Sequence, residues 1–169
     1  MSNSIELIKQ LRAETGSGLA DVKEALEVSN NDVEAARAYL RKKGAAKAEK
    51  RAEREANQGI IAHYVHTTNR VGVLVEVNCE TDFVARNEDF LEFAHNVALQ
   101  VAALSPIYVS EEEMPESAQE GLKAEDVCLV LQPFFKDGSK TIGDMMKETS
   151  AKVGEAVKIR RFTRYEVGG

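Results

Sequence analysis

The chain has 169 residues, of which 43% are hydrophobic and 30% are charged, and its formal net charge is −6. This composition excludes a wholly disordered chain, and the length is enough to bury a hydrophobic core. The acidic balance argues against a general nucleic-acid binder, which presents a basic contact surface. Because no apolar run approaches the roughly 20 residues that cross a bilayer, and no secretory signal opens the chain, we expect a cytoplasmic protein.

Residues 4–43 have the apolar spacing of three short amphipathic helices. Gly16 and Gly18 separate the first helix from the second, Asn30 and Asn31 end the second, and Asn31 or Asp32 can cap the third. The three apolar stripes are Ile5, Ile8 and Leu11; Leu19, Val22, Ala25 and Leu26; and Val33, Ala36 and Leu40. We therefore expect a three-helix domain over residues 1–44 that binds a partner.

Residues 45–57 are rich in alanine and charge and contain few large apolar residues. Gly44 is expected to end the third helix, and opposite charges at helical spacing, such as Arg51 with Glu55, favour a separate solvent-exposed helix. We predict a connector helix here, with a basic side that can contact an acidic surface.

Two strands follow at residues 59–66 and 71–79, joined by a hairpin loop at 67–70. One face of the second strand is apolar: Val71, Val73, Val75, Val77 and Cys79. This is the period of a half-buried strand, so we expect Cys79 to be a buried, reduced thiol. With Cys128 as the other cysteine, no CxxC pair exists for zinc and no disulfide framework is expected.

The rest of the chain predicts helices that pack on this sheet. A helix begins at Asn87, an acidic surface excursion follows Pro106, Asp137 and Gly138 form a turn, and another helix begins near Thr141. Residues 157–167 form a third strand whose apolar parity changes, which predicts a bulge near Arg160. The prediction is an α+β fold, with a small antiparallel three-stranded sheet and its helices over residues 58–169.

The second strand leads into Thr81, Asp82, Phe83 and Val84. A large apolar ring beside a carboxylate at a strand end is suited to enter the pocket of another protein. The residues alone leave a second interpretation open, in which Asp82 caps a helix and Phe83 lies in the core.

No pattern of catalytic or metal-binding residues stands out. His63 and His66 point to opposite faces of their strand, and His95 is isolated on a helix, so they cannot share a metal ion. The chain also lacks a nucleophile paired with a base, and paired carboxylates on one face. We therefore expect no enzyme activity, no metal and no cofactor.

Six stretches, in order along the chain, carry the motifs of one known family. They are LRAETGSGLADVKEAL from Leu11, AARAYLRKKG from Ala35, NQGIIAHYVH from Asn57, VGVLVEVNCETDFVARN from Val71, LQPF from Leu131 and GEAVKIRRFTRY from Gly154. Several separated motifs in one order are far more specific than one short pattern. On these motifs the chain resembles the elongation factor Ts family.

This resemblance implies a guanine nucleotide exchange factor of translation elongation. Such a protein binds elongation factor Tu with GDP, promotes GDP release by disturbing the magnesium and phosphate site, and leaves when GTP binds. The segment that approaches that site is Thr81, Asp82, Phe83 and Val84. The front helices resemble a ubiquitin-associated-like domain that contacts the same GTPase, with Leu11, Arg12, Thr15, Gly16 and Lys23 at matching positions. No direct nucleic-acid or membrane contact is implied.

The chain departs from the family pattern in two places. Leu19, Ala20 and Val22 stand where relatives commonly have two methionines and a cysteine, and the passage between Glu116 and Val127 is much shorter than in many relatives. Compact members can complete their contact surface with a second copy, so we expect a homodimer. The alternative functions are an adaptor built on the helical domain, without exchange activity, and, less well supported by the residues, a small enzyme.

Overall fold

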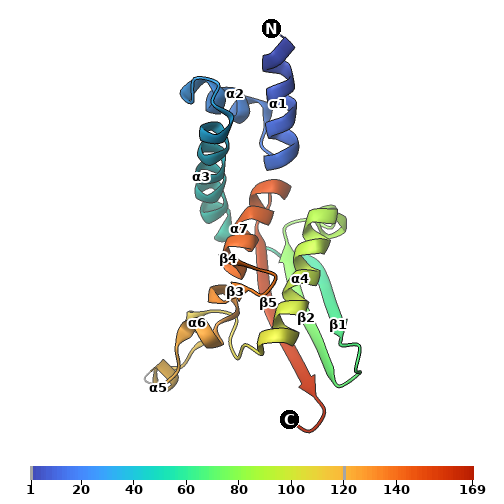
Figure 1. Ribbon diagram of the computed structural model, residues 1–169. Helices are drawn as coiled ribbons and strands as arrows, with labels where there is room; N and C mark the ends of the chain where they lie inside the picture. The colour runs from blue at the N-terminus through green and yellow to red at the C-terminus, as the bar shows by residue number, and fades with distance from the viewer. Residues whose placement is uncertain (1, 120) are drawn as a thin grey trace.

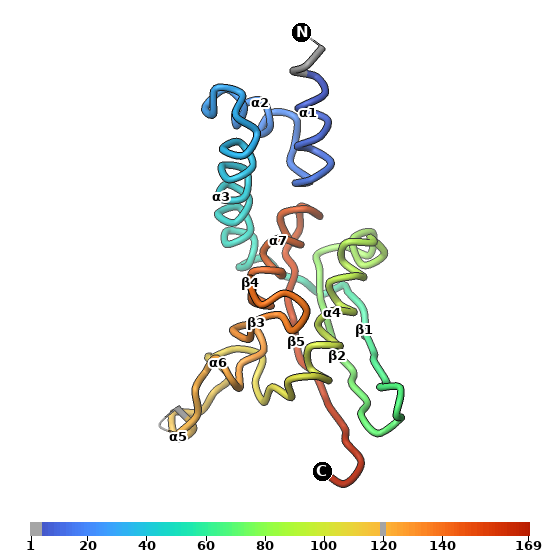
Figure 2. Tube along the Cα trace, in the orientation of Figure 1, coloured from blue at the N-terminus to red at the C-terminus, as the bar shows by residue number. Residues whose placement is uncertain are grey.

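The computed structural model describes residues 2–119 and 121–169 and shows an elongated molecule with its two termini at opposite ends (Figures 1 and 2). Helices α1 (Ser2–Thr15) and α2 (Leu19–Val28) form one end, and α3 (Val33–Ala52) runs from them toward the sheet. Their shared core contains Leu11, Val22, Ala25, Leu26, Ala36 and Leu40. The predicted stripes meet in one small core, with Ile8 and Val33 partly buried against it, but the prediction is wrong for Ile5 and Leu19, which are exposed.

Local chemistry explains where these helices begin and end. Asn30 and Asn31 both have positive φ values, which asparagine tolerates better than most residues, and they turn the chain after α2. The Asp32 carboxylate accepts a hydrogen bond of 2.8 Å from the Ala35 amide and caps α3. These predicted boundaries are confirmed.

The expected break at Gly44 is wrong, because α3 passes through this residue without interruption. A Cβ atom added to Gly44 would lie 3.3 Å from the Cβ of Ala151 in α7 (Ile142–Val153), so the glycine allows two helices to approach closely. Ala48 is buried, and Arg51 donates a hydrogen bond of 3.3 Å to the Ser150 carbonyl. The predicted connector is thus the second half of α3, packed on α7. The division into 1–44, 45–57 and 58–169 stays a prediction.

The sheet is antiparallel, with the order β1 (Gln58–Val65), β2 (Val71–Cys79) and β5 (Val157–Glu166). Glu76 lies opposite Arg161 while Val77 lies opposite Ile159, so Arg160 is the extra residue of a bulge. The predicted α+β fold and its three-stranded sheet are confirmed, as is the bulge.

One face of the sheet packs against α4 (Glu88–Leu104) and α7. Asn87 caps α4 by accepting a 2.9 Å hydrogen bond from the Asp89 amide, and Thr141 and Asp144 form a capping box at α7. The core between sheet and helices includes Val73, Val75, Val77, Cys79, Phe90, Val97, Val101 and Ile142. Burial, with help from the negative charge of Glu155, raises the pKa of the Cys79 thiol, which is free.

Between α4 and α7 the chain makes short elements along the edge of the core. In order they are η2 (Glu111–Glu113), α5 (Glu116–Gln119), α6 (Ala124–Val127), η3 (Leu129–Leu131), β3 (Pro133–Phe134) and β4 (Asp137–Thr141). The turn predicted at Asp137 and Gly138 is wrong, because both residues lie in β4, which pairs with β3. The buried Gln100 holds this hairpin to α4 through hydrogen bonds to the Pro133 carbonyl and from the Phe135 amide, each 3.0 Å.

No helix in residues 2–119 and 121–169 combines the length and apolar character that a membrane span requires.

Phe90 should carry a large share of the stability of the sheet domain. Its ring is fully buried in the main core, while its neighbour Leu91 is 41% exposed. We expect Phe90→Ala to lower the free energy of unfolding by about 3–5 kcal/mol, and Leu91→Ala to lower it by less than about 1 kcal/mol. Urea unfolding monitored by circular dichroism measures both. Equal losses in the two variants would contradict the packing described here.

Candidate partner-binding site

The predicted binding segment lies in the turn that joins β2 to α4. After Cys79 the chain leaves the sheet, passes through residues 80–83 and enters the short helix η1 (Val84–Arg86). Val84 packs on the main core, but the Phe83 side chain points away from it and is 83% exposed. This is the most exposed large apolar side chain in the described part of the chain. The turn therefore offers an aromatic ring to solvent.

The backbone of this turn is fixed by a carboxylate from another element. Glu155, just before β5, accepts hydrogen bonds from the Thr81 amide at 3.0 Å and from the Thr81 hydroxyl at 2.7 Å. Glu80 accepts a 2.7 Å hydrogen bond from the Ala156 amide in the same way. Hydrogen bonds to charged groups are stronger than neutral ones. Residues 80 and 81 are therefore tied to the segment that precedes β5.

Asp82 and Phe83 do not have the roles of the second interpretation. Asn87, and not Asp82, caps α4, and Phe83 lies outside the core, so that interpretation is wrong. The Asp82 carboxylate lies 3.2 Å from the guanidinium of Arg86, and both side chains are mostly exposed. Asp82 thus remains accessible beside the ring, with Arg86 as a neighbour that the sequence analysis did not single out.

The five predicted residues of the helical domain have unequal positions. Leu11 is fully buried in the helical core, so it can support a contact surface but cannot form one. Arg12 and Lys23 are exposed. Thr15 donates a 2.6 Å hydrogen bond to the Leu11 carbonyl, and Gly16 has a φ of 65°, so these two residues shape the turn after α1.

The end of α7 joins the two predicted sets. A Cβ atom on Gly16 would lie 3.1 Å from the Cα of Lys152, whose ammonium group lies 3.0 Å from the carboxylate of Asp89 in α4. Three residues further on, Glu155 holds Thr81. Lys152 and Glu155 were not predicted from the sequence as positioning residues. The sequence contained a signal for Glu155, because this residue is the second of the GEAVKIRRFTRY motif.

Within residues 2–119 and 121–169, no three His, Cys, Asp or Glu side chains form a group that could hold a metal ion.

Comparison with known proteins shows the family of this chain. A sequence profile of the family described as Elongation factor TS matches residues 4–124. Elongation factor Ts of Leptospira biflexa is 46% identical over 197 aligned positions that cover 100% of both chains. Elongation factor Ts of Thermotoga neapolitana is 46% identical, over 99% of this chain and 98% of its own. The chain belongs to the elongation factor Ts family.

As a member of this family, the chain is a cytoplasmic translation factor that promotes nucleotide exchange on elongation factor Tu, and it is not an enzyme. The adaptor function considered above is set aside. Elongation factor Ts of Moorella thermoacetica is a further relative, 44% identical over 95% of this chain and 93% of its own. The Leptospira alignment spans more positions than the 169 residues of this chain, so the alignment contains gaps on the side of this chain.

The brace on Thr81 can be tested with Glu155→Gln. The substitution removes the charge that strengthens both hydrogen bonds, so we expect a loss of about 1–2 kcal/mol in stability and about tenfold faster hydrogen exchange at the Thr81 amide. Glu92→Gln, on the exposed side of α4, is the matched control and should change neither quantity. Unchanged exchange at Thr81 in Glu155→Gln would show that the turn is held by other contacts.

Proposed function

We propose that Thr81, Asp82, Phe83 and Val84 form the segment that acts on elongation factor Tu. The observation that carries this proposal is the 83% exposure of Phe83 on a turn whose backbone is tied to Glu155. A rigid, exposed aromatic ring loses little conformational entropy when it binds, and such residues often dominate the binding energy of an interface. Phe83 would enter an apolar pocket of the GTPase domain.

In the proposed mechanism, the exchange factor and the guanine nucleotide bind the same GTPase, and each weakens the binding of the other. A GTPase holds its nucleotide through backbone donors and a magnesium ion that bridges phosphates, so disturbing the surroundings of that ion weakens the nucleotide complex. The Asp82 side chain would either be oriented by the backbone of the partner or disturb the surroundings of the magnesium ion. Because coupling free energies are reciprocal, an incoming nucleotide weakens the binding of the exchange factor and releases it.

The helical domain would supply a second contact with the same GTPase. Arg12 and Lys23 are the accessible members of the predicted set, while Leu11, Thr15 and Gly16 hold the shape of the α1 end. Gly16 also packs on Lys152, next to the segment that holds Thr81. The helical domain and the Phe83 turn would then both contribute to the affinity for the GTPase, because they lie on one rigid support. Only the Phe83 turn would disturb the bound nucleotide.

Stopped-flow release of fluorescent GDP from elongation factor Tu tests this assignment. We expect wild type to accelerate release strongly and Phe83→Ala to require about 30-fold more factor for the same effect, which corresponds to about 2 kcal/mol of lost binding. Asp82→Ala, measured in parallel, separates a role of the carboxylate from that of the ring.

Phe135→Ala is the matched control, because Phe135 is also a partly exposed phenylalanine but lies in the β3–β4 turn. It should retain the wild-type acceleration. If Phe83→Ala, Asp82→Ala and wild type accelerate release equally at equal folded content, the active surface lies elsewhere on the molecule.

We also propose that the protein forms a homodimer through the outer face of its sheet. Ile61, Val65, Leu74 and Tyr165 project from the side opposite the core and are all at least 49% exposed. Beside them, Arg161 pairs with Glu76 at 2.8 Å. A two-fold axis through this face would place apolar side chains on apolar ones and Glu76 of one copy near Arg161 of the other.

Leu74→Asp should abolish this dimer, because a carboxylate cannot be buried in an apolar interface without a partner. We expect sedimentation equilibrium to give about twice the chain mass of 18.6 kDa for wild type and the single-chain mass for Leu74→Asp. Leu122→Asp, at an exposed leucine outside the sheet, should behave as wild type. A wild-type monomer, or a Leu74→Asp dimer, would contradict the proposal.

A further inference from the structure

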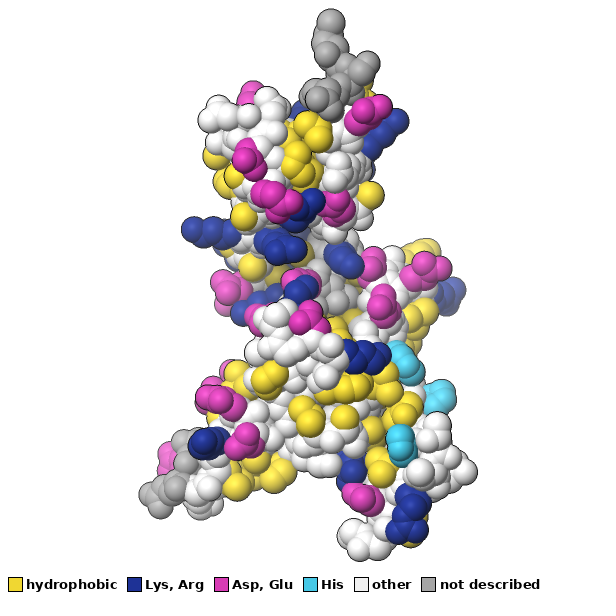
Figure 3. Space-filling model, in the orientation of Figure 1, with side chains coloured by type: hydrophobic (Ala, Val, Ile, Leu, Met, Phe, Trp, Pro, Cys, Tyr) yellow, Lys and Arg dark blue, Asp and Glu magenta, His cyan; other side chains and the backbone are white. Residues whose placement is uncertain are grey.

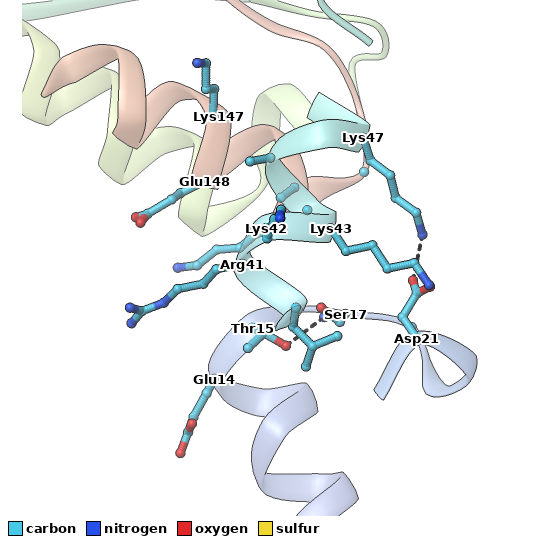
Figure 4. A pocket seen from close by; sticks show the side chains of 18 of the residues that line it. Glu14, Thr15, Ser17, Asp21, Arg41, Lys42, Lys43, Lys47, Lys147 and Glu148 are labelled. Atoms are coloured by element: carbon cyan, nitrogen blue, oxygen red, sulfur yellow. Dashed lines mark hydrogen bonds and ion pairs between the residues drawn. The ribbon is translucent and has the colours of Figure 1, made fainter. Parts of the chain in front are cut away.

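A pocket of about 750 Å³ lies where the helical domain meets the sheet domain. Its walls come from the turn between α1 and α2, from α3 and from α7, with the end of β4 at its edge (Figure 4). This volume is within the range of sites that hold small molecules and cofactors, about 300–1,000 Å³. Of the residues proposed above for the contact with elongation factor Tu, Thr15 and Gly16 lie at the edge of this pocket, and its lysines and arginines are not among them.

The lining is strongly basic in a protein that is acidic overall. Eight of the lining residues are Lys or Arg and four are Asp or Glu, whereas the whole chain has a net charge of −6. In the space-filling view, Lys and Arg side chains gather over α3 at its junction with the sheet domain (Figure 3). A concave surface lined by one sign of charge concentrates ligands of the opposite sign.

The acidic residues of the lining are already engaged. Glu14 accepts a 2.7 Å hydrogen bond from Arg37, and Glu148 accepts one of 2.6 Å from Lys140. Asp144 belongs to the capping box of α7. The fourth, Asp21, binds Lys47 at 2.7 Å and Lys43 at 2.9 Å, and these two cations hold the pKa of its carboxyl below the ordinary value.

Arg41 and Lys42 are left without an acidic partner among the described residues. Both side chains are exposed, and they extend from α3 on the side opposite Asp21, between the Glu14 end of α1 and Glu148 of α7 (Figure 4). Lys43 and Lys47 extend to the other side and are occupied. The pocket therefore holds an arginine and a lysine that form no ion pair among the described residues, although the carboxylates of Glu14 and Glu148 lie on either side of them.

The N-terminus of α2 lines the other side of the pocket, next to Asp21 and away from Arg41 and Lys42 (Figure 4). Gly18, which lines the pocket, is the N-cap of α2 and provides no side-chain hydrogen bond to the first turn. The first amides of a helix lack intrahelical acceptors, so an uncapped N-terminus adds donors and a partial positive charge. Arginine and lysine side chains are groups with which proteins bind phosphate, so Arg41 and Lys42 are the candidate ligands of this pocket.

We infer that this pocket binds a small phosphate-bearing anion of nucleoside polyphosphate size, held mainly by Arg41 and Lys42. The volume sets the size of the ligand, and the surplus of cations favours a ligand with several negative charges. A bound anion would lie in the pocket between α3 and α7, at the junction of the helical domain and the sheet domain.

The test uses the full chain and inorganic triphosphate, with isothermal titration calorimetry at about 50 mM salt, where charge interactions are weakly screened. We expect saturable binding to wild type and about tenfold or more weaker binding to Arg41→Ala/Lys42→Ala. Amide NMR shifts should be confined to the turn between α1 and α2, the middle of α3 and the end of α7. GDP should bind at least as tightly as triphosphate, and guanosine should not bind.

Lys9→Ala/Arg160→Ala is the matched control, because it removes the same two charges from exposed positions outside the pocket. It should bind triphosphate as wild type does. The inference is overturned if triphosphate up to about 5 mM gives no binding, if both double variants lose affinity equally, or if a single-stranded RNA binds this surface while triphosphate does not.

Discussion

The pair of hydrogen bonds from Thr81 to the Glu155 carboxylate is the contact on which the proposed contact surface depends. The turn after β2 has few apolar groups of its own to bury, because its largest side chain is directed outward. Without a fixed backbone, an exposed ring would fold back onto the nearest apolar surface. A carboxylate that accepts from both the amide and the hydroxyl of one residue holds that backbone, while Val84 and Ala85 anchor the next residues in the core. Phe83 is thereby kept exposed at a defined position.

Helix α7 extends this constraint to the other end of the molecule. Ala151 meets Gly44 of α3 and Lys152 meets Gly16 of the α1 end, and a Cβ atom on either glycine would crowd the contact, at 3.3 Å and 3.1 Å respectively. The segment that begins after Gly154, at the end of α7, carries Glu155. The position of the helical domain and the position of the Phe83 turn therefore share one support. A partner that contacts both surfaces meets a preorganised pair of sites and does not have to order a flexible link between them.

The parts of the fold that local patterns determine could be predicted from the sequence, and the parts that depend on distant contacts could not. Alternation in β2, the stripe of α4 and the parity change at Arg160 each have one structural solution, and the structure has them. Gly44 reads locally as a helix end, yet its role is set by Ala151, more than a hundred residues away. The β3–β4 hairpin depends on the buried Gln100, whose amide satisfies backbone groups that sequence patterns do not reveal. For the turn, the residues alone left Phe83 open between core and surface, since an isolated aromatic residue carries no periodicity.

The distribution of charge and apolar surface suggests why the elements are separated in this way. An exposed phenylalanine is unfavourable in water, and its cost in the free protein is recovered only when a partner covers it, which makes the ring a selective group. The basic pocket at the α3–α7 junction has the opposite character, because its cations attract many anions. Only the volume of the pocket limits which anion fits. The first lies on a turn braced by Glu155 and the second lies at the junction of α3 and α7, so the two are separate surfaces. One surface can then respond to a protein and the other to a small anion, and α7 is the element through which the two would be coupled.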